Sequence, residues 1–297
     1  MDRFFYKRSG ESFTDFFVQR FSNRIIPLIL IMIVSTIFAE ENVTSVDHFN
    51  IKSGEHSEID YNKSVFKMDS PDDSLIAGKH IMFKSIEFHG GSEYLTKIKD
   101  MEVTAIMKIT TTKGSVDITN KNIVLFDDDV LLKSDITTPE GRVITTFDGE
   151  NAGMSTPQGF RVLKGDQREE FMQSIFCNTI NLLKGISEGR YTAKFVDFTT
   201  IKEHDVFVIK VEDTKGRYAL FYIDSNDYAL VGKSYRTRSF SGIIRYDEWF
   251  ESFKRVNNFD FPFSIMVDMN DETYGQTRVK ELKINSGIVR QAFNVTE

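Results

Sequence analysis

The side chains whose type and spacing suggest a function are apolar and lie in one segment, residues 166–186. Between Phe171 and Leu183 this segment carries no charged residue. At about 100° per residue, its apolar side chains cover roughly half of a helix circumference, whereas a surface helix needs a stripe only a little over 100° wide. The excess predicts one helix that faces a sheet and also borders an apolar cavity. The side chains expected to line that cavity are Phe171, Met172, Ile175, Phe176, Ile180 and Leu183.

The chemistry that such a surface performs is the removal of an acyl chain from water. Each buried methylene contributes about 0.8 kcal/mol, so a chain of about 16 carbons represents roughly 12 kcal/mol of transfer free energy. A carrier must also release its cargo, which favours loose contacts with adaptable side chains such as Met172. The alternative is that the same stripe only completes the hydrophobic core, and both interpretations can hold together.

Other residue types give no catalytic or metal site. Cys177 is the only cysteine, which excludes a disulfide and a cysteine-rich metal site, and its apolar surroundings predict a small buried hydrophobe. The five histidines lack the HExxH spacing, and no GxSxG, P-loop or GxGxxG motif occurs. A net charge of −7 argues against nucleic acid as a partner. We therefore expect a protein that is not an enzyme and has no cofactor.

One locally basic segment stands out in this acidic chain. If residues 234–239 form a strand, Arg236 and Arg238 share one face of it. They are the candidates for contact with anionic lipid headgroups, and the alternative is an ordinary solvated strand face.

The elements that would position these residues belong to a mainly β domain. Asp166 and Glu169 have capping-box spacing, and Gly185 is placed to end the helix. A first helix is expected over 75–88. Elsewhere, short alternating segments separated by turn residues predict antiparallel strands, because none alternates with helices in βαβ fashion.

The N-terminal part differs from this domain. Residues 25–39 are apolar and uncharged, but the run is shorter than the roughly 20 residues that a spanning helix prefers. Basic residues before it and acidic residues after it predict export of the rest of the chain. Two interpretations remain: a signal peptide cleaved near Ala39, or an N-terminal membrane anchor. Residues 40–75 are polar and acidic, which predicts a disordered linker before a domain over 76–297.

The domain resembles a known family, the bacterial periplasmic lipoprotein-localisation carriers of the LolA and LolB type. The resemblance spans residues 76–297 and rests on the order and spacing of short segments. These are HGG at 89–91, LTKIK at 95–99, TFDGE at 146–150, RYALFYID at 217–224, FP at 261–262, LKIN at 282–285 and AF at 292–293.

The resemblance implies an incomplete antiparallel β-barrel of about eleven strands, with helices plugging its mouth around an apolar cavity. It implies a periplasmic carrier whose partners are lipoprotein acyl chains or other lipids, and a membrane-bound donor or acceptor protein. The alternatives are a membrane-tethered regulatory domain that senses lipid or binds a partner, and a non-enzymatic accessory domain of an exported protease.

Overall fold

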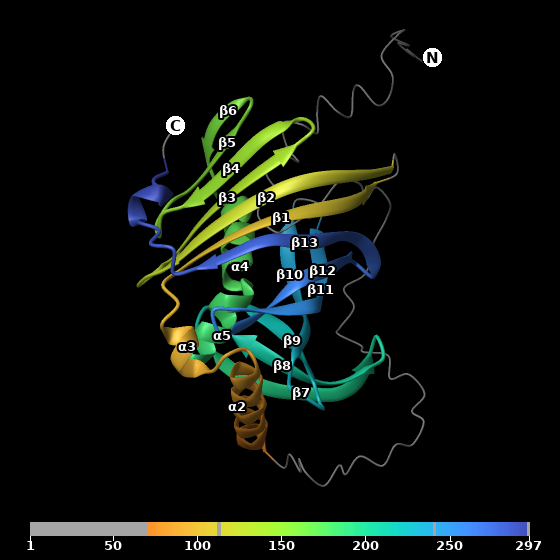
Figure 1. Ribbon diagram of the computed structural model, residues 1–297. Coiled ribbons are helices and arrows are strands. Elements are labelled where there is room, and N and C mark those ends of the chain that lie inside the picture. Colours follow the sequence, from red (N-terminus) through yellow and green to blue (C-terminus); the bar gives the residue numbers. More distant parts are fainter. Residues whose placement is uncertain (1–69, 112–113, 240–241, 296–297) are drawn as a thin grey trace, which may run out of the picture.

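The computed structural model describes residues 70–111, 114–239 and 242–295 (Figure 1). The expected signal peptide or anchor at 1–39 and most of the expected linker at 40–75 lie outside these residues. Residues 70–75 of that linker segment are described, and they open the first helix of the described residues, which starts at Pro71 and not at the expected residue 75.

One antiparallel sheet of 13 strands forms the framework. Its strand order is β6-β5-β4-β3-β2-β1-β13-β12-β11-β10-β9-β8-β7. The strands are β1 (Asp100–Thr111), β2 (Gly114–Phe126), β3 (Val130–Thr138), β4 (Gly141–Phe147), β5 (Ala152–Thr156), β6 (Gly159–Val162), β7 (Thr192–Ile201), β8 (His204–Glu212), β9 (Tyr218–Asp224), β10 (Leu230–Ser239), β11 (Gly242–Val256), β12 (Phe259–Met269) and β13 (Glu272–Ile284).

This order explains how a local hairpin pattern produces a curled sheet. Each strand pairs with its neighbour in sequence, except that β1 pairs with β13 in the middle, while β6 and β7 form the two edges. Figure 1 shows the sheet curving around the helices that connect these edges. The predicted incomplete antiparallel barrel is therefore confirmed. It has 13 strands rather than the number of about eleven that the resemblance implied.

Helix α2 (Pro71–Phe88) packs against β7 near one edge of the sheet. It begins with a capping box, because Ser70 and Asp73 exchange side-chain and backbone hydrogen bonds. A Cβ atom on Gly78 would lie 2.6 Å from the carbonyl oxygen of Ala193, so glycine allows this close approach. Helix α3 (Ser92–Thr96) follows. Of the helices in the described part of the chain, none is long and apolar enough to cross a membrane.

The single helix predicted over 166–186 was wrong. The structure has α4 (Asp166–Phe176) and α5 (Thr179–Ser187), separated at Cys177 and Asn178. The backbone of Asn178 leaves the helical conformation (φ −57°, ψ 125°), and its side chain accepts a hydrogen bond from the backbone N–H of Asn181. Asn178 is thus the N-cap of a second helix, a position at which asparagine is strongly favoured.

The expected bounds of that segment agree with the structure to within one residue, but the residues expected to cap its ends do not do so. The N-cap of α4 is Gly165, which makes no side-chain capping bond, so Asp166 lies inside the first turn. There its charge still favours the helix N-terminus. Gly185 lies inside α5, where a Cβ atom would come within 2.2 Å of the Tyr191 ring. The backbone reaches positive φ (71°) only at Gly189.

Both faces of the second half of the sheet are covered. The main core fills the concave side, and a smaller cluster on the outer side contains Val206, Val208, Leu220 and Tyr222. On that outer side, the Tyr222 and Trp249 rings stack with centroids 5.2 Å apart. This second cluster accounts for strands that are apolar on both faces.

Candidate functional site: a cavity beneath the break between two helices

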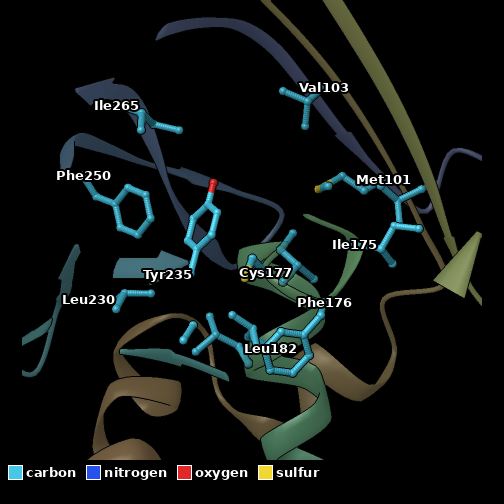
Figure 2. Close-up of a cluster of buried hydrophobic side chains, with 14 of the residues drawn as sticks. Met101, Val103, Ile175, Phe176, Cys177, Leu182, Leu230, Tyr235, Phe250 and Ile265 are labelled. Carbon is cyan, nitrogen blue, oxygen red and sulfur yellow. The ribbon is translucent and has the colours of Figure 1, made fainter. Parts of the chain in front are cut away.

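A cavity of about 120 Å³ lies between the concave face of the sheet and the break between α4 and α5. Its apolar wall includes Met101, Val103, Ala105, Val124, Val130, Leu132, Ile175, Ile180, Phe261, Ile265 and Val279. Figure 2 shows part of this surrounding cluster, with Tyr235 among Cys177, Phe250 and Ile265. The cavity is smaller than the roughly 300–1,000 Å³ of typical ligand pockets, and close to the roughly 150 Å³ that can hold benzene. A long chain would require movement of the helices.

A buried ion pair lies in the cavity wall. Lys233 on β10 and Glu248 on β11 stand directly opposite each other in the antiparallel register. The Lys233 ammonium nitrogen lies 3.1 Å from Glu248 Oε2, and the two side chains are 5% and 14% exposed. The Tyr235 hydroxyl, two residues further along β10, donates to Glu248 Oε1 at 2.9 Å. Such a pair is stable when buried only if its remaining donors and acceptors are satisfied.

The ammonium group of Lys233 also connects the sheet to the helix break. It donates to the carbonyl oxygen of Cys177 at 2.7 Å and to Thr179 Oγ1 at 3.2 Å. Cys177 is the C-cap of α4, where carbonyl groups lack helical partners and the helix dipole favours a cation. With Glu248, these contacts use all three donors of the ammonium group.

Two more carbonyl groups at this end of α4 accept hydrogen bonds from α5. The Asn181 amide nitrogen donates to the carbonyl oxygens of Ile175 at 3.1 Å and Phe176 at 3.3 Å. One residue from the sheet and one from α5 therefore hold the break in place. This explains a helix interruption that contains neither glycine nor proline.

The electrostatic environment disfavours negative charge on the acids of the cavity. Burial raises the pKa of the Cys177 thiol to about 12; Lys233 opposes the rise and Glu248 adds to it. Burial, followed by the charge of Glu248, raises the pKa of Tyr235 well above its usual value. Cys177 is thus a buried neutral thiol.

The structure brings two of the six predicted cavity residues to the cavity. Ile175 and Ile180 line it. Phe171 and Phe176 are buried in the adjoining core, where they pack edge-on against Phe147 and Tyr191. Leu183 is fully buried and Met172 partly buried in that core. Their contact with a lipid chain stays a prediction.

The two predicted headgroup contacts, Arg236 and Arg238, lie on one face of β10, as expected from strand alternation. Because Lys233 and Tyr235 line the cavity, alternation places the two arginines on the opposite, outer face. Their contact with headgroups also stays a prediction.

The sequence interpretation missed the polar part of the wall, above all Lys233, Tyr235 and Glu248. The sequence did contain a signal for the pairing of Lys233 with Glu248. A hairpin that pairs Ser239 with Gly242 sets these two residues opposite each other. Opposite charges at such cross-strand positions favour pairing. In the described part of the chain, no three His, Cys, Asp or Glu side chains are grouped so as to hold a metal ion.

The fold of this chain resembles those of solved structures. No protein-family model matches the chain, and no curated protein matches it in sequence. Among solved structures, it resembles an outer-membrane lipoprotein-sorting protein domain from Vibrio parahaemolyticus (10% identity, 74% of this chain and 97% of that chain, TM-score 0.50). It also resembles a DUF1329 family protein from Desulfovibrio piger (10% identity, 74% and 97%, TM-score 0.53).

These similarities cover about three quarters of this chain and nearly all of each of the two matched chains. At 10% identity they define the fold and not the activity. The chain therefore shares the fold of the outer-membrane lipoprotein-sorting protein domain, as the resemblance of its sequence implied.

Proposed function

We propose that this chain is an exported carrier or binding protein that holds the acyl chain of a lipid or lipoprotein beneath α4 and α5. The observation that carries the proposal is the apolar cavity between the concave sheet and the helix break. The fold shared with a lipoprotein-sorting domain supports the same class of cargo.

The geometry suits a carrier because a single side chain makes the polar connection from the sheet to the break. The polar connection from sheet to break passes through one side chain, Lys233, which bonds the backbone of Cys177 and the hydroxyl of Thr179. Release of this connection would let the helices move and enlarge the cavity without unfolding the sheet. Such movement supplies the room that an acyl chain needs.

Filling the cavity tests the proposal. Ala105 is 2% exposed and lines the cavity from β1, so Ala105→Leu would occupy space that a ligand needs. Thr104→Leu, at the neighbouring position whose side chain points to the other face of β1, is the matched control. The full chain is titrated with 1-decanoylglycerol by calorimetry, and folding of each variant is checked by thermal unfolding.

We expect saturable binding by the natural chain and by Thr104→Leu, and binding at least about tenfold weaker for Ala105→Leu, because a filled cavity loses contact with the chain. Absence of binding by the natural chain would refute the proposal. Equal binding by Ala105→Leu would show that this cavity is not the site.

A further inference from the structure

The charges that face the cavity cancel. Of the residues that line it, only Lys233 from β10 and Glu248 from β11 are charged, and they form an ion pair. The other titratable groups in the wall are Tyr235 from β10 and Cys177 from the helix break. The strands β1, β2, β3, β12 and β13 and the helices contribute uncharged side chains. A ligand therefore meets a wall with no net charge.

The cation in this wall is not free to bind an anion. Its three donors are used by the Cys177 carbonyl, Thr179 Oγ1 and Glu248. A ligand carboxylate could bind Lys233 only by displacing the Thr179 hydroxyl at 3.2 Å, or by leaving the C-terminal carbonyl of α4 or the Glu248 carboxylate buried without its cation. Either loss opposes binding, because an unpaired buried charge or carbonyl group is costly.

The pKa values of Cys177 and Tyr235 show that the cavity disfavours negative charge. Burial is the main reason why the pKa values of Cys177 and Tyr235 are raised, and the charge of Glu248 adds to both. A carboxylic acid that enters the same space meets the same low polarity and the same neighbouring carboxylate. Its ionised form is penalised in the same direction.

An uncharged polar group, by contrast, finds an unused partner. The Thr277 hydroxyl on β13 lines the cavity, is 1% exposed and has no hydrogen-bond partner. Thr277 pairs with Ile265, which pairs with Phe250, two positions from Glu248 along β11. A hydroxyl donates to a carbonyl oxygen, so the ester or amide carbonyl of an acylated ligand would satisfy it.

We propose that Glu248 makes this cavity selective against anionic amphiphiles, and that the ligand presents an ester or amide carbonyl to Thr277 instead of a free carboxylate. This inference rests on the proposed function and adds the chemical class of the ligand. Glu248 is the residue that determines selectivity, and Thr277 is the residue that recognises the carbonyl group.

Two ligands with the same acyl chain test the proposal: decanoate, which is anionic at pH 8, and uncharged 1-decanoylglycerol. Each is titrated by calorimetry into the full chain, into Glu248→Gln and into Thr277→Val, with Glu251→Gln as control on an exposed position of β11. Glutamine preserves the shape of Glu248 and an acceptor for Tyr235, and valine preserves the shape of Thr277. Thermal unfolding confirms that each variant is folded.

At pH 8 the natural chain should bind 1-decanoylglycerol at least about tenfold more tightly than decanoate. Lowering the pH should strengthen decanoate binding by up to about tenfold per unit, because the bound acid is neutral. Glu248→Gln should gain decanoate affinity by about tenfold at pH 8, since Lys233 is then not neutralised. Thr277→Val should weaken 1-decanoylglycerol binding by about three- to tenfold, the range for one lost hydrogen bond.

The outcomes separate this inference from the proposed function. Failure of both ligands to bind at any pH overturns both. Equal binding of the two ligands at pH 8, or a Glu248→Gln variant that still discriminates against decanoate, overturns only the selectivity. Unchanged 1-decanoylglycerol binding by Thr277→Val overturns the role of that hydroxyl.

Discussion

The ammonium nitrogen of Lys233 lies 2.7 Å from the carbonyl oxygen of Cys177, and this contact joins β10, an inner strand of the curled sheet, to the C-terminus of α4. These residues are far apart in sequence, and the contact exists only because β10 passes beneath the helix break. It fixes the position of the break and, with Glu248, completes a buried polar cluster in a cavity that is otherwise mostly apolar.

Removal of this ammonium group should destabilise the protein strongly. Lys233→Met leaves the Glu248 carboxylate buried without its cation, which costs about 3–5 kcal/mol in the free energy of unfolding. Urea unfolding measures the loss, and amide hydrogen exchange should accelerate at 177–181. The control is Lys210→Met, which removes a more exposed ion pair to Glu212 and should cost less than about 1 kcal/mol. Equal losses for the two variants would contradict the role of Lys233.

The sheet was largely predictable because its signal is local. Strand β1 alternates apolar and polar residues, and the hairpin turns are marked by glycine and aspartate, so an antiparallel sheet follows from neighbouring residues alone. The pairing of β1 with β13 carries no such local signal. It joins, for example, Met101 to Ile284, and the sequence interpretation did not predict it.

The site was less predictable because it depends on contacts between distant elements. The width of the apolar arc over 166–186 correctly indicated burial on several sides, but not a break in the helix. Without glycine or proline at the break, helical periodicity continued through Cys177, while the side chains that stabilise the interruption come from β10 and from Asn181. Only Ile175 and Ile180 of the predicted residues consequently reach the cavity.

The carboxyl group of Glu170 on α4 should make stability fall as the pH rises. Glu170 is 4% exposed and its Oε1 has no hydrogen-bond partner. Burial, and secondarily the charge of Asp166, raises its pKa to about 8. The folded state therefore binds this proton more tightly than the unfolded state, and the stabilisation present below about pH 4.5 is lost as the pH rises towards 8.

Glu170→Gln removes this loss of stability at high pH. It should raise the free energy of unfolding by about 3 kcal/mol at pH 8, but by little at pH 4.5. Thermal unfolding between pH 4.5 and 8.5 measures the difference. Glu169→Gln, on the exposed side of the same helix, is the control and should leave the pH profile unchanged. If the stability of Glu170→Gln changed with pH in parallel with that of the natural chain, Glu170 would not be the cause of the loss of stability.

His89 at the end of α2 should make the protein sensitive to acid. It is 1% exposed; its Nδ1 lies 2.7 Å from the carbonyl oxygen of Asp260, and its Nε2 accepts from the backbone N–H of Leu230 at 3.3 Å. Only neutral histidine can accept that hydrogen bond while it donates to Asp260. Burial lowers the pKa of His89, against the hydrogen bond to Asp260, which raises it.

The folded state therefore binds this proton less tightly than the unfolded state, so stability is lost as the pH falls below about 6.5. His89→Leu should lower the free energy of unfolding at pH 8 by about 2–4 kcal/mol, because two buried backbone groups lose their partner. Its stability should fall less steeply between pH 7 and 5. His204→Asn, at an exposed histidine, is the control. If the free energy of unfolding of His89→Leu fell between pH 7 and 5 as steeply as that of the natural chain, this explanation would be contradicted.

The two glycines that follow His89 should differ in their tolerance of alanine. Both have positive φ, 114° at Gly90 and 86° at Gly91. A Cβ atom on Gly90 would lie 2.1 Å from the carbonyl oxygen of Asn258, whereas the nearest atom to one on Gly91 is a flexible Glu87 oxygen at 3.4 Å. Gly90→Ala should therefore cost about 3 kcal/mol or more, from backbone strain and overlap, and Gly91→Ala about 1–2 kcal/mol, from strain alone. Urea unfolding of the two variants measures the difference; similar losses would mean that the contact between α2 and the turn at Asn258 is looser than the structure shows.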